Sequence, residues 1–309
     1  MVDILLSTYN GERFLPDLIE SIILQSFKNW RLIVRDDGST DKTIDIILNY
    51  SKILGERLHF LFGNEKVGFL KSFDILGKAS DRNYIMFCDQ DDVWIENKIE
   101  ITLGKIKELE KKYGEEEPLF VFTDLKIVDE ALNTISESYF KFRRLSPYIA
   151  FKFNKLLVQN VITGCTVMIN KKLKEIAFPI PEEAIFHDWW VGLVASLTGR
   201  IGYLNEKTVL YRQHSMNTSG KLKKFDFFYA IEKIMEGKTR IIEDLKLSRL
   251  RAKILLERYE DLLGEKEKNT LQVFSHFEEY SFFKRKYEML RNGFFKSGIL
   301  RNIYLFCLI

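Results

Sequence analysis

The sequence predicts an α/β fold in which a mostly parallel central sheet is flanked by helices and followed by a helical C-terminal region. Five short runs rich in β-branched and aromatic residues have the apolar character of parallel strands covered on both faces; they are residues 2–7, 31–35, 58–62, 84–88 and 119–122. Segments with helical periodicity lie between the first and second runs and between the second and third runs. Such alternation is typical of βαβ units and a parallel sheet.

The segment between the first two strands is predicted to be a helix because its apolar residues recur every three or four positions. These residues are Leu15, Leu18, Ile19, Ile22 and Ile23. Pro16 suits the first turn of such a helix. The next connecting segment repeats the pattern around Ile47, and Ser39, Thr40 and Asp41 are candidates to cap it.

The pattern changes after Phe225, where long amphipathic helices replace strands. The apolar residues at helical spacing are Phe228, Ile231, Ile234, Met235, Ile241, Ile242, Leu245, Leu250, Ile254 and Leu255. Gly237 and Gly264 are candidate breaks between helices. We therefore expect a main domain over residues 1–220 and a helical region over residues 221–309.

The composition, 46% hydrophobic over 309 residues, allows a sizeable core. Three widely spaced cysteines, Cys88, Cys165 and Cys307, favour a reducing, cytoplasmic compartment. The N-terminal segment lacks the basic residues of a signal peptide, and no apolar run reaches the roughly 18–20 residues that a bilayer span needs. We expect a soluble or peripheral protein.

The net charge of +3 conceals an asymmetry between the two regions. Residues 221–309 hold 19 Lys and Arg against 13 Asp and Glu, a balance of +6, whereas residues 1–220 hold 28 against 31, a balance of −3. The apolar and basic segment 294–309 is too short to span a bilayer, so we expect it to lie against the inner face of the cytoplasmic membrane. Packing on the main domain or on a partner subunit is the alternative. No base-stacking motif accompanies the basic helices, so a nucleic-acid partner is not expected.

Polar clusters follow three of the predicted strands: STYNG (7–11), DDGSTD (36–41) and DQDD (89–92). Ligands bind beyond the carboxyl ends of the strands in open sheets of this class. Two like charges about 4 Å apart repel by roughly 4 kcal/mol at an effective dielectric constant near 20, so the acidic DQDD run points to water or to a cation. Three such clusters at one sheet edge favour a ligand site over surface turns.

Three further motifs, NVITGCT (160–166), HDWW (187–190) and YRQH (211–214), complete an ordered set of six. With this set, residues 1–220 resemble the family 2 glycosyltransferases of the GT-A fold, and within them the bacterial rhamnosyltransferase-like members. The resemblance implies a metal-dependent inverting transferase that moves rhamnose from dTDP-rhamnose to a saccharide acceptor in the synthesis of cell-surface polysaccharide. A UDP-hexose donor is the alternative.

The resemblance assigns the donor nucleotide to Ser7, Thr8 and Tyr9 of the first motif and to Asp37 of the second. An aromatic ring can cover the face of a base, and a carboxylate can accept the imide N–H of uracil or thymine. This chemistry selects a UDP- or dTDP-linked donor. Asp36 is expected to cap the turn that follows, with no catalytic role.

The DQDD run corresponds to the DXD motif of the family. By this resemblance Asp91 binds a divalent cation, Mg²⁺ or Mn²⁺, that bridges the diphosphate, and Asp89 approaches the ribose or that cation. His214 resembles a third protein ligand and favours Mn²⁺ modestly, while Arg212 is expected to face the diphosphate. Asp92 is expected to support the metal ligands or to cap a helix that begins directly after the motif.

HDWW lies where the family keeps its general base, so Asp188 is expected to deprotonate the acceptor hydroxyl; capping of the following helix is the alternative. An unperturbed Asp has a pKa of about 3.9. Apolar surroundings from Trp189 and Trp190 are expected to raise it, and the two rings are candidates to stack on sugars. NVITGCT is expected to place Gly164 and Cys165 on a strand below the acceptor.

One segment departs from the family pattern: Phe73 and Asp74 stand where many relatives carry a basic residue followed by Asn, which leaves the donor-sugar contacts open. A sugar-1-phosphate nucleotidyltransferase is a second hypothesis, but STYNGERF lacks the glycine-rich basic loop of that class. A non-catalytic binding module would not need both Asp91 and Asp188. The expected partners are a nucleotide-diphosphate sugar and a lipid-linked saccharide acceptor.

Overall fold

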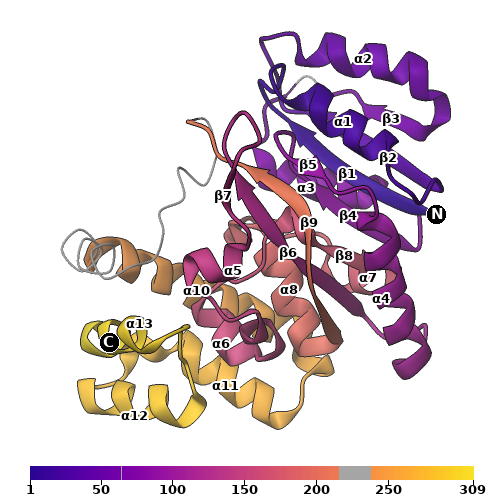
Figure 1. Ribbon diagram of the computed structural model, residues 1–309. Helices are drawn as coiled ribbons and strands as arrows, with labels where there is room; N and C mark the ends of the chain where they lie inside the picture. The colour runs from indigo at the N-terminus through magenta and orange to yellow at the C-terminus, as the bar shows by residue number, and fades with distance from the viewer. Residues whose placement is uncertain (64, 216–237) are drawn as a thin grey trace. The chain divides into compact units, whose positions relative to one another are not determined.

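The structure is a computed structural model that describes residues 1–63, 65–215 and 238–309 (Figure 1). The described residues form two compact units. The first comprises residues 1–139 (except 64), 162–195 and 199–215, and the second comprises residues 140–161, 196–198 and 238–309. The predicted helical residues Phe228, Ile231, Ile234 and Met235 and the predicted break at Gly237 lie outside the described residues.

The N-terminal half of the sheet in the first unit is parallel, as predicted. Strands β1 (Val2–Thr8), β2 (Trp30–Asp36), β3 (Leu58–Leu61) and β4 (Tyr84–Cys88) lie in the order β3-β2-β1-β4 with every neighbouring pair parallel. Thr8 aligns with Asp36 across β1 and β2, and Leu6 aligns with Cys88 across β1 and β4. The carboxyl ends of β1, β2 and β4 therefore meet at one edge.

The other half of the sheet is mixed, in the order β8-β6-β9-β5 with β7 beside β6. Its strands are β5 (Val93–Trp94), β6 (Leu119–Val128), β7 (Thr134–Ser136), β8 (Met168–Asn170) and β9 (Arg200–Arg212). β8 is antiparallel to both β4 and β6, whereas β6 and β9 are parallel. Residues before β8 and residues after β9 therefore lie at the same edge as the carboxyl end of β4.

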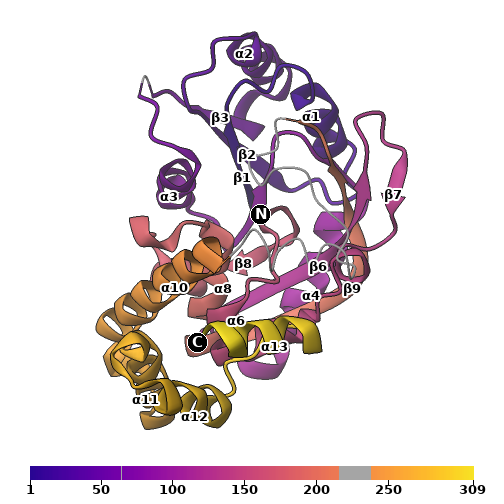
Figure 2. The ribbon, with the colours of Figure 1, turned by 90° about the vertical axis from the view of Figure 1, so that its left-hand side faces the viewer.

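Helices α1 (Leu15–Ile23), α2 (Thr43–Leu54), α3 (Phe69–Ala79), α4 (Lys98–Tyr113), α7 (Lys171–Ala177) and α8 (His187–Thr198) connect these strands (Figures 1 and 2). The predicted helices between the first three strands are confirmed. Pro16 lies in the first turn of α1. The N-cap of α2 is Lys42, and Asp41 accepts a hydrogen bond from Thr43 N (3.0 Å), so Asp41 supports the first turn from one position earlier.

The second unit is helical. Helix α5 (Tyr139–Arg143) leads into it, and α6 (Phe153–Val158), α10 (Lys238–Tyr259), α11 (Glu265–Ser275), α12 (Phe282–Asn292) and α13 (Ile299–Leu308) build it (Figure 2). Buried Phe294 packs on Phe274 and Phe277, with ring centroids 4.7 and 6.0 Å apart. The helical pattern over residues 241–255 and the break at Gly264, the N-cap of α11, are confirmed. The domain boundary at residue 220 stays a prediction. No helix within the described ranges is long and apolar enough to cross a bilayer.

Candidate functional site

The loops after β1, β2 and β4 are joined by hydrogen bonds between residues of the three motifs. Gln90 Nε2 donates to Tyr9 O (2.9 Å), and Gln90 Oε1 accepts from Tyr9 N (2.8 Å). Thr8 Oγ1 donates to Asp36 Oδ2 (2.8 Å). A Cβ atom on Gly11 would lie 2.5 Å from Gln90 Oε1, so a larger residue at position 11 would displace the Gln90 side chain. The predicted convergence of the three strand ends is therefore present.

The residues predicted to hold a nucleotide differ in exposure. Ser7 is half-buried and Thr8 is buried at the end of β1, whereas the ring of Tyr9 is 41% exposed, with Lys66 Nζ 3.8 Å from its centroid. Asp36 Oδ1 accepts from Ser39 N (2.7 Å) and from the amide that precedes it in the turn, which confirms the predicted turn cap.

Asp37 is buried, and both of its carboxylate oxygens are bound. Oδ1 accepts from Val67 N (2.7 Å) and from Arg35 Nη1 (2.9 Å), and Oδ2 accepts from Gly68 N (2.9 Å). Asp37 thus holds the loop before α3 against the end of β2. Its contact with a nucleotide base stays a prediction.

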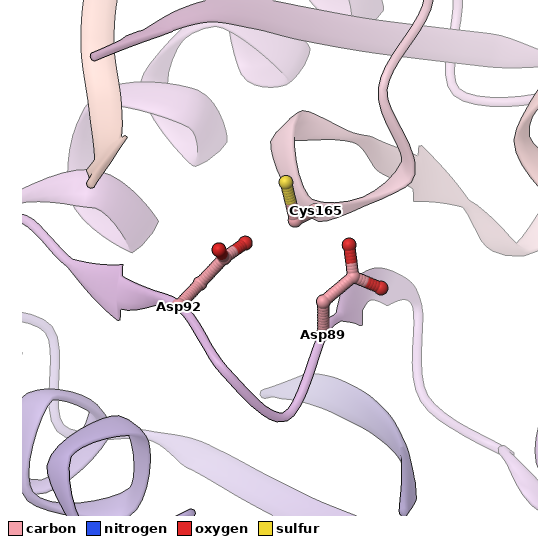
Figure 3. Close-up of side chains that lie close together, drawn as sticks. All are labelled: Asp89, Asp92 and Cys165. Carbon is pink, nitrogen blue, oxygen red and sulfur yellow. The ribbon is translucent and has the colours of Figure 1, made fainter. Parts of the chain in front are cut away.

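Two carboxylates and a thiol gather beyond the end of β4. One oxygen of Asp89, one of Asp92 and Cys165 Sγ lie within 4.8 Å of one another, and Figure 3 shows the carboxylates of Asp89 and Asp92 turned toward Cys165 from either side. Asp92 Oδ1 accepts from Arg212 N (3.2 Å), but Oδ2 is buried without a hydrogen-bond partner among the described residues. Burial raises the pKa of Asp89 to about 7, helped by the charges of the neighbouring carboxylates, and burial also raises the pKa of Asp92.

Two expectations for this region were wrong. The residues after Asp92 form strand β5, and the next helix, α4, begins only at Lys98, so Asp92 caps no helix. Gly164 and Cys165 lie in a 3₁₀ turn (Gly164–Thr166) that precedes β8, because β8 is only three residues long. This turn brings Cys165 to the acidic cluster.

Lys98 is a buried cation of this region that sequence analysis missed. Its Nζ donates to Cys165 O (2.9 Å) and to Thr208 Oγ1 (3.3 Å), and burial lowers its pKa to about 8. A lysine in the first turn of an amphipathic helix carries no local signal of burial. Lys98 holds the turn that carries Cys165 in place.

Asp91 and His214 form a second pair beside the cluster. His214 Nε2 lies 2.7 Å from Asp91 Oδ2, although 123 residues separate them, and the imidazole is buried against Phe14 with ring centroids 4.8 Å apart. Because β9 is parallel to β6, the residues after its carboxyl end reach the DQDD loop. The structure thus brings together two of the three residues predicted as metal ligands, Asp91 and His214, while the third, Asp89, groups with Asp92 and Cys165.

Arg212 supports the acidic loop through its guanidinium. Nε donates to Asp91 O (2.9 Å), Nη1 to Glu130 O (2.6 Å) and Nη2 to Asp17 Oδ2 (2.8 Å), and the group lies over the Phe14 ring. The sequence offered no signal for Asp17 as a partner. The predicted contact between Arg212 and a diphosphate stays a prediction.

The acidic groups fit a divalent cation. Three carboxylates within four positions repel one another, and this repulsion adds to the burial that raises the pKa of Asp89. A buried carboxylate oxygen of Asp92 without a partner among the described residues has the chemistry of a hard-cation ligand or of a group that orients one. Carboxylate oxygens together with an imidazole nitrogen are donors that suit Mg²⁺ or Mn²⁺.

Asp188 lies in the first turn of α8, where its Oδ1 accepts from Trp189 N (2.6 Å). A Cβ atom on Gly164, next to Cys165, would lie 3.5 Å from Asp188 Cβ, so Asp188 lies beside the acidic cluster. The charge of Asp188 adds to the burial that raises the pKa of Asp89. Trp190 is fully buried and its Nε1 donates to Ala177 O (2.8 Å), so the expectation that this ring stacks on a sugar is wrong. Trp189 is half-buried.

A strained turn positions the start of α8. Ile185 has φ of +65° and ψ of −49°, and Phe186 N donates to Ala184 O (2.7 Å) across it, which is a γ-turn of the rare positive-φ kind. Such a conformation costs about 1–3 kcal/mol and persists only where packing demands it. The turn directs His187 into the core and leaves Asp188 half-buried.

His187 has a structural role, and so do Phe73 and Asp74, the two residues that differ from the family pattern. The His187 imidazole stacks on Phe73 with centroids 3.8 Å apart, and neither ring nitrogen has a hydrogen-bond partner in the described part of the chain. A Cβ on Gly164 would lie 2.7 Å from His187 Nε2. Asp74 is buried and accepts from Ile180 N (2.9 Å). Neither the Phe73 nor the Asp74 side chain is free to contact a donor sugar.

The family model for glycosyl transferase family 2 matches residues 3–175. The putative teichuronic acid biosynthesis glycosyltransferase TuaG of Bacillus subtilis is 33% identical over 103 residues, which are 33% of this chain and 40% of TuaG. The dTDP-rhamnosyl transferase RfbG of Shigella flexneri is 28% identical over 222 residues, 70% of this chain and 73% of RfbG. An Escherichia coli enzyme, the UDP-Glc:alpha-D-GlcNAc-diphosphoundecaprenol beta-1,3-glucosyltransferase WfgD, is 27% identical over 61% of this chain and 68% of its own length.

Solved structures show the same fold. Staphylococcus aureus TarS residues 1–349 in complex with UDP-GlcNAc superposes with a TM-score of 0.55 at 17% identity, covering 93% of this chain and 83% of TarS. The mannosyltransferase PcManGT from Pyrobaculum calidifontis in complex with GDP-Man and Mn²⁺ has a TM-score of 0.54 at 14% identity, covering 99% of this chain and 85% of PcManGT. At these identities the likeness concerns the fold alone.

Proposed function

This chain belongs to glycosyl transferase family 2 and has the GT-A fold, and from this premise we propose that it is a metal-dependent inverting glycosyltransferase acting in cell-surface polysaccharide synthesis. The observation that carries the proposal is the convergence of Tyr9, Asp91, His214 and Asp188 on one sheet edge from four distant motifs. Tyr9 is held by Gln90 of the acidic loop, and Asp91 lies beside His214. Asp188 lies beside Gly164, where a Cβ atom would be 3.5 Å from Asp188 Cβ.

We propose that Ser7, Thr8, Tyr9 and Asp37 bind the nucleoside, with the exposed Tyr9 ring covering the base after Lys66 moves aside. Asp37 would support nucleoside binding through the loop before α3, which its carboxylate holds in place. A UDP- or dTDP-linked donor suits these groups. RfbG is named for a dTDP-rhamnosyl donor and WfgD for a UDP-glucose donor, so both remain candidates, with dTDP-rhamnose proposed first.

Asp89, Asp91 and His214 would hold Mg²⁺ or Mn²⁺, with Asp92 behind them. A bound divalent cation would neutralise the charge that develops on the departing diphosphate. Arg212 acts as a positioning residue in this scheme, because its Nε donates to Asp91 O of the DQDD loop while Nη1 and Nη2 donate to Glu130 O and Asp17 Oδ2.

Asp188 would take the proton of the acceptor hydroxyl as that oxygen attacks the anomeric carbon from the face opposite the leaving group. The strained turn at Ile185 presents Asp188 at the start of α8. We propose a saccharide acceptor carried on a lipid, as in the name of WfgD, and a cytoplasmic enzyme that meets this acceptor at the membrane.

Release of nucleoside diphosphate from dTDP-rhamnose and UDP-glucose, with water as the acceptor, tests the proposal without a known saccharide acceptor. Asp91→Asn should abolish both this release and the metal-dependent part of UDP or dTDP binding in calorimetry. Asp188→Asn should keep nucleotide affinity while release falls by a factor of about 10². The exposed Asp45→Asn on α2 is the control. Full activity of the wild type in excess EDTA would refute metal dependence, and equal losses of binding and turnover in Asp188→Asn would remove its role as base.

A further inference from the structure

Large apolar side chains are exposed along the two last helices of the second unit. Of the 24 large hydrophobic side chains that are exposed among the described residues, eight lie in α12 and α13, which together hold 21 residues. They are Phe282, Phe283, Tyr287, Leu290, Ile299, Leu300, Ile303 and Phe306, and Phe283 and Ile299 reach 82% and 78% exposure. Such a concentration marks an interaction surface.

Helical spacing places these residues on one outward face of each helix. On α12, Phe283 and Tyr287 are four residues apart, and Phe282 and Leu290 are eight apart on the same side. On α13, Ile299, Ile303 and Phe306 follow the same rule. The opposite faces carry Met289 and Leu305, which are buried in the unit. The outward faces of both helices therefore take no part in the core of the unit.

Lys286 joins the two faces into one surface. Its Nζ lies 4.8 Å from the centroid of the Phe282 ring on α12 and 4.3 Å from that of the Phe306 ring on α13. We call the eight exposed residues and Lys286 the α12–α13 surface. Lys286 Nζ is buried and has no hydrogen-bond partner among the described residues, so the Lys286 side chain links the two helices from inside. The exposed cations beside the apolar residues are Lys284 and Arg291.

The surroundings of this surface are positively charged. Residues 281–309 hold six Lys and Arg and a single acidic side chain, Glu288. Glu288 is buried, and its carboxylate accepts from Asn292 Nδ2 (3.0 Å). The surface thus presents cations and apolar groups without an exposed carboxylate. Each basic residue near an anionic leaflet adds up to a factor of about five in affinity, which is about 1 kcal/mol.

We propose that the α12–α13 surface binds an anionic lipid bilayer, with both helices lying in the interface. A second copy of the chain is a poor occupant, because an isologous contact would oppose two surfaces of the same positive charge. Membrane binding by this surface does not depend on the proposed activity. Only its role, which is to bring the enzyme to a lipid-linked acceptor, rests on the proposed function. The proposal corrects the expectation for segment 294–309, because Phe294, Leu305 and Ile309 are buried and α12 supplies half of the surface.

Co-sedimentation of the full chain with vesicles tests the proposal independently of catalysis. We expect binding to phosphatidylcholine vesicles that contain phosphatidylglycerol, weaker binding at high salt, and weak binding to phosphatidylcholine alone. The double variant Phe283→Ser, Ile303→Ser should bind at least about tenfold more weakly, since each side chain buries an apolar area worth about that factor. The matched control Ile53→Ser, Phe62→Ser removes an isoleucine and a phenylalanine of the first unit that are 72% and 77% exposed, and it should bind like the wild type.

Charge reversal at Lys284 and Arg291 gives a second arm that leaves the apolar residues intact. This variant should lose the preference for phosphatidylglycerol, and release of nucleoside diphosphate should be unchanged in every variant. Absence of wild-type binding at low salt, or unchanged binding of both variants, would overturn the proposal. Light scattering that shows a wild-type dimer, dissociated by the Phe283→Ser, Ile303→Ser variant without any vesicle binding, would overturn it in favour of a second copy.

Discussion

The buried imidazole of His187 should make the first unit sensitive to acid. Its neighbours Phe73 and Phe87 offer no charge, and burial lowers its pKa from 6.5 to about 3. A folded-state pKa below the unfolded value means that the unfolded chain takes up a proton first as the pH falls. Stability from this group is therefore intact above about pH 6.5 and is lost progressively down to about pH 3.

The magnitude follows from the two pKa values. At about pH 5 the unfolded imidazole is almost fully protonated and the folded one is neutral, which removes about 2 kcal/mol of stability relative to about pH 7.5. In His187→Phe this loss should vanish, because phenylalanine keeps the stack on Phe73 and cannot titrate. Other groups titrate in both proteins, so the measured quantity is the difference between them.

The assay is urea unfolding at the two pH values, followed by tryptophan fluorescence. All four tryptophans lie in the first unit, so the signal reports on the unit that contains His187. His187→Leu should give the same pH difference as His187→Phe even if its packing is worse. The control His59→Phe, at an exposed position on β3, should behave like the wild type. Equal losses of stability at about pH 5 in wild type and both His187 variants would refute the reasoning.

Two other substitutions test how the site is held. Gly11→Ala should displace Gln90, cost its two hydrogen bonds to the first loop, or about 1–3 kcal/mol, and weaken UDP and dTDP binding in calorimetry. Gly104→Ala, whose Cβ meets no atom within 4 Å, is the control; unchanged nucleotide affinity in Gly11→Ala would contradict this role of the loop contact. Arg212→Lys should lower the free energy of unfolding by about 1–3 kcal/mol, because an ammonium cannot reach Asp17 and both carbonyls together. A loss of UDP affinity with unchanged stability would instead assign Arg212 to the diphosphate.

Features written in short stretches of sequence were predictable. The apolar runs of β1, β2 and β4 and the polar motifs after them indicated a ligand site at one sheet edge, because parallel strands end together. The turn cap of Asp36 depends on amides two and three residues away, so its local sequence encodes it. The helical periodicity of the C-terminal region was predictable because it depends on residues only three or four positions apart.

Other features depend on which strands become neighbours, and no local pattern records that. Asp92 and Cys165 are far apart in the chain, and they meet only because the short β8 enters the sheet antiparallel to β4. Arg212 and Asp17 are 195 residues apart, and the burial of Lys98 arises from contacts with residues 67 and 110 positions away.

By itself, the sequence determined the family, the strand-end motifs and the helical character of the C-terminal region, since these follow from residue type and periodicity within each element. Only the tertiary structure decided that Trp190 is core, that Phe294 points inward and that α12 and α13 share one exposed apolar surface. The physical reason is that a side chain becomes buried only where another part of the folded chain packs against it. For these residues that surface comes from a distant part of the chain.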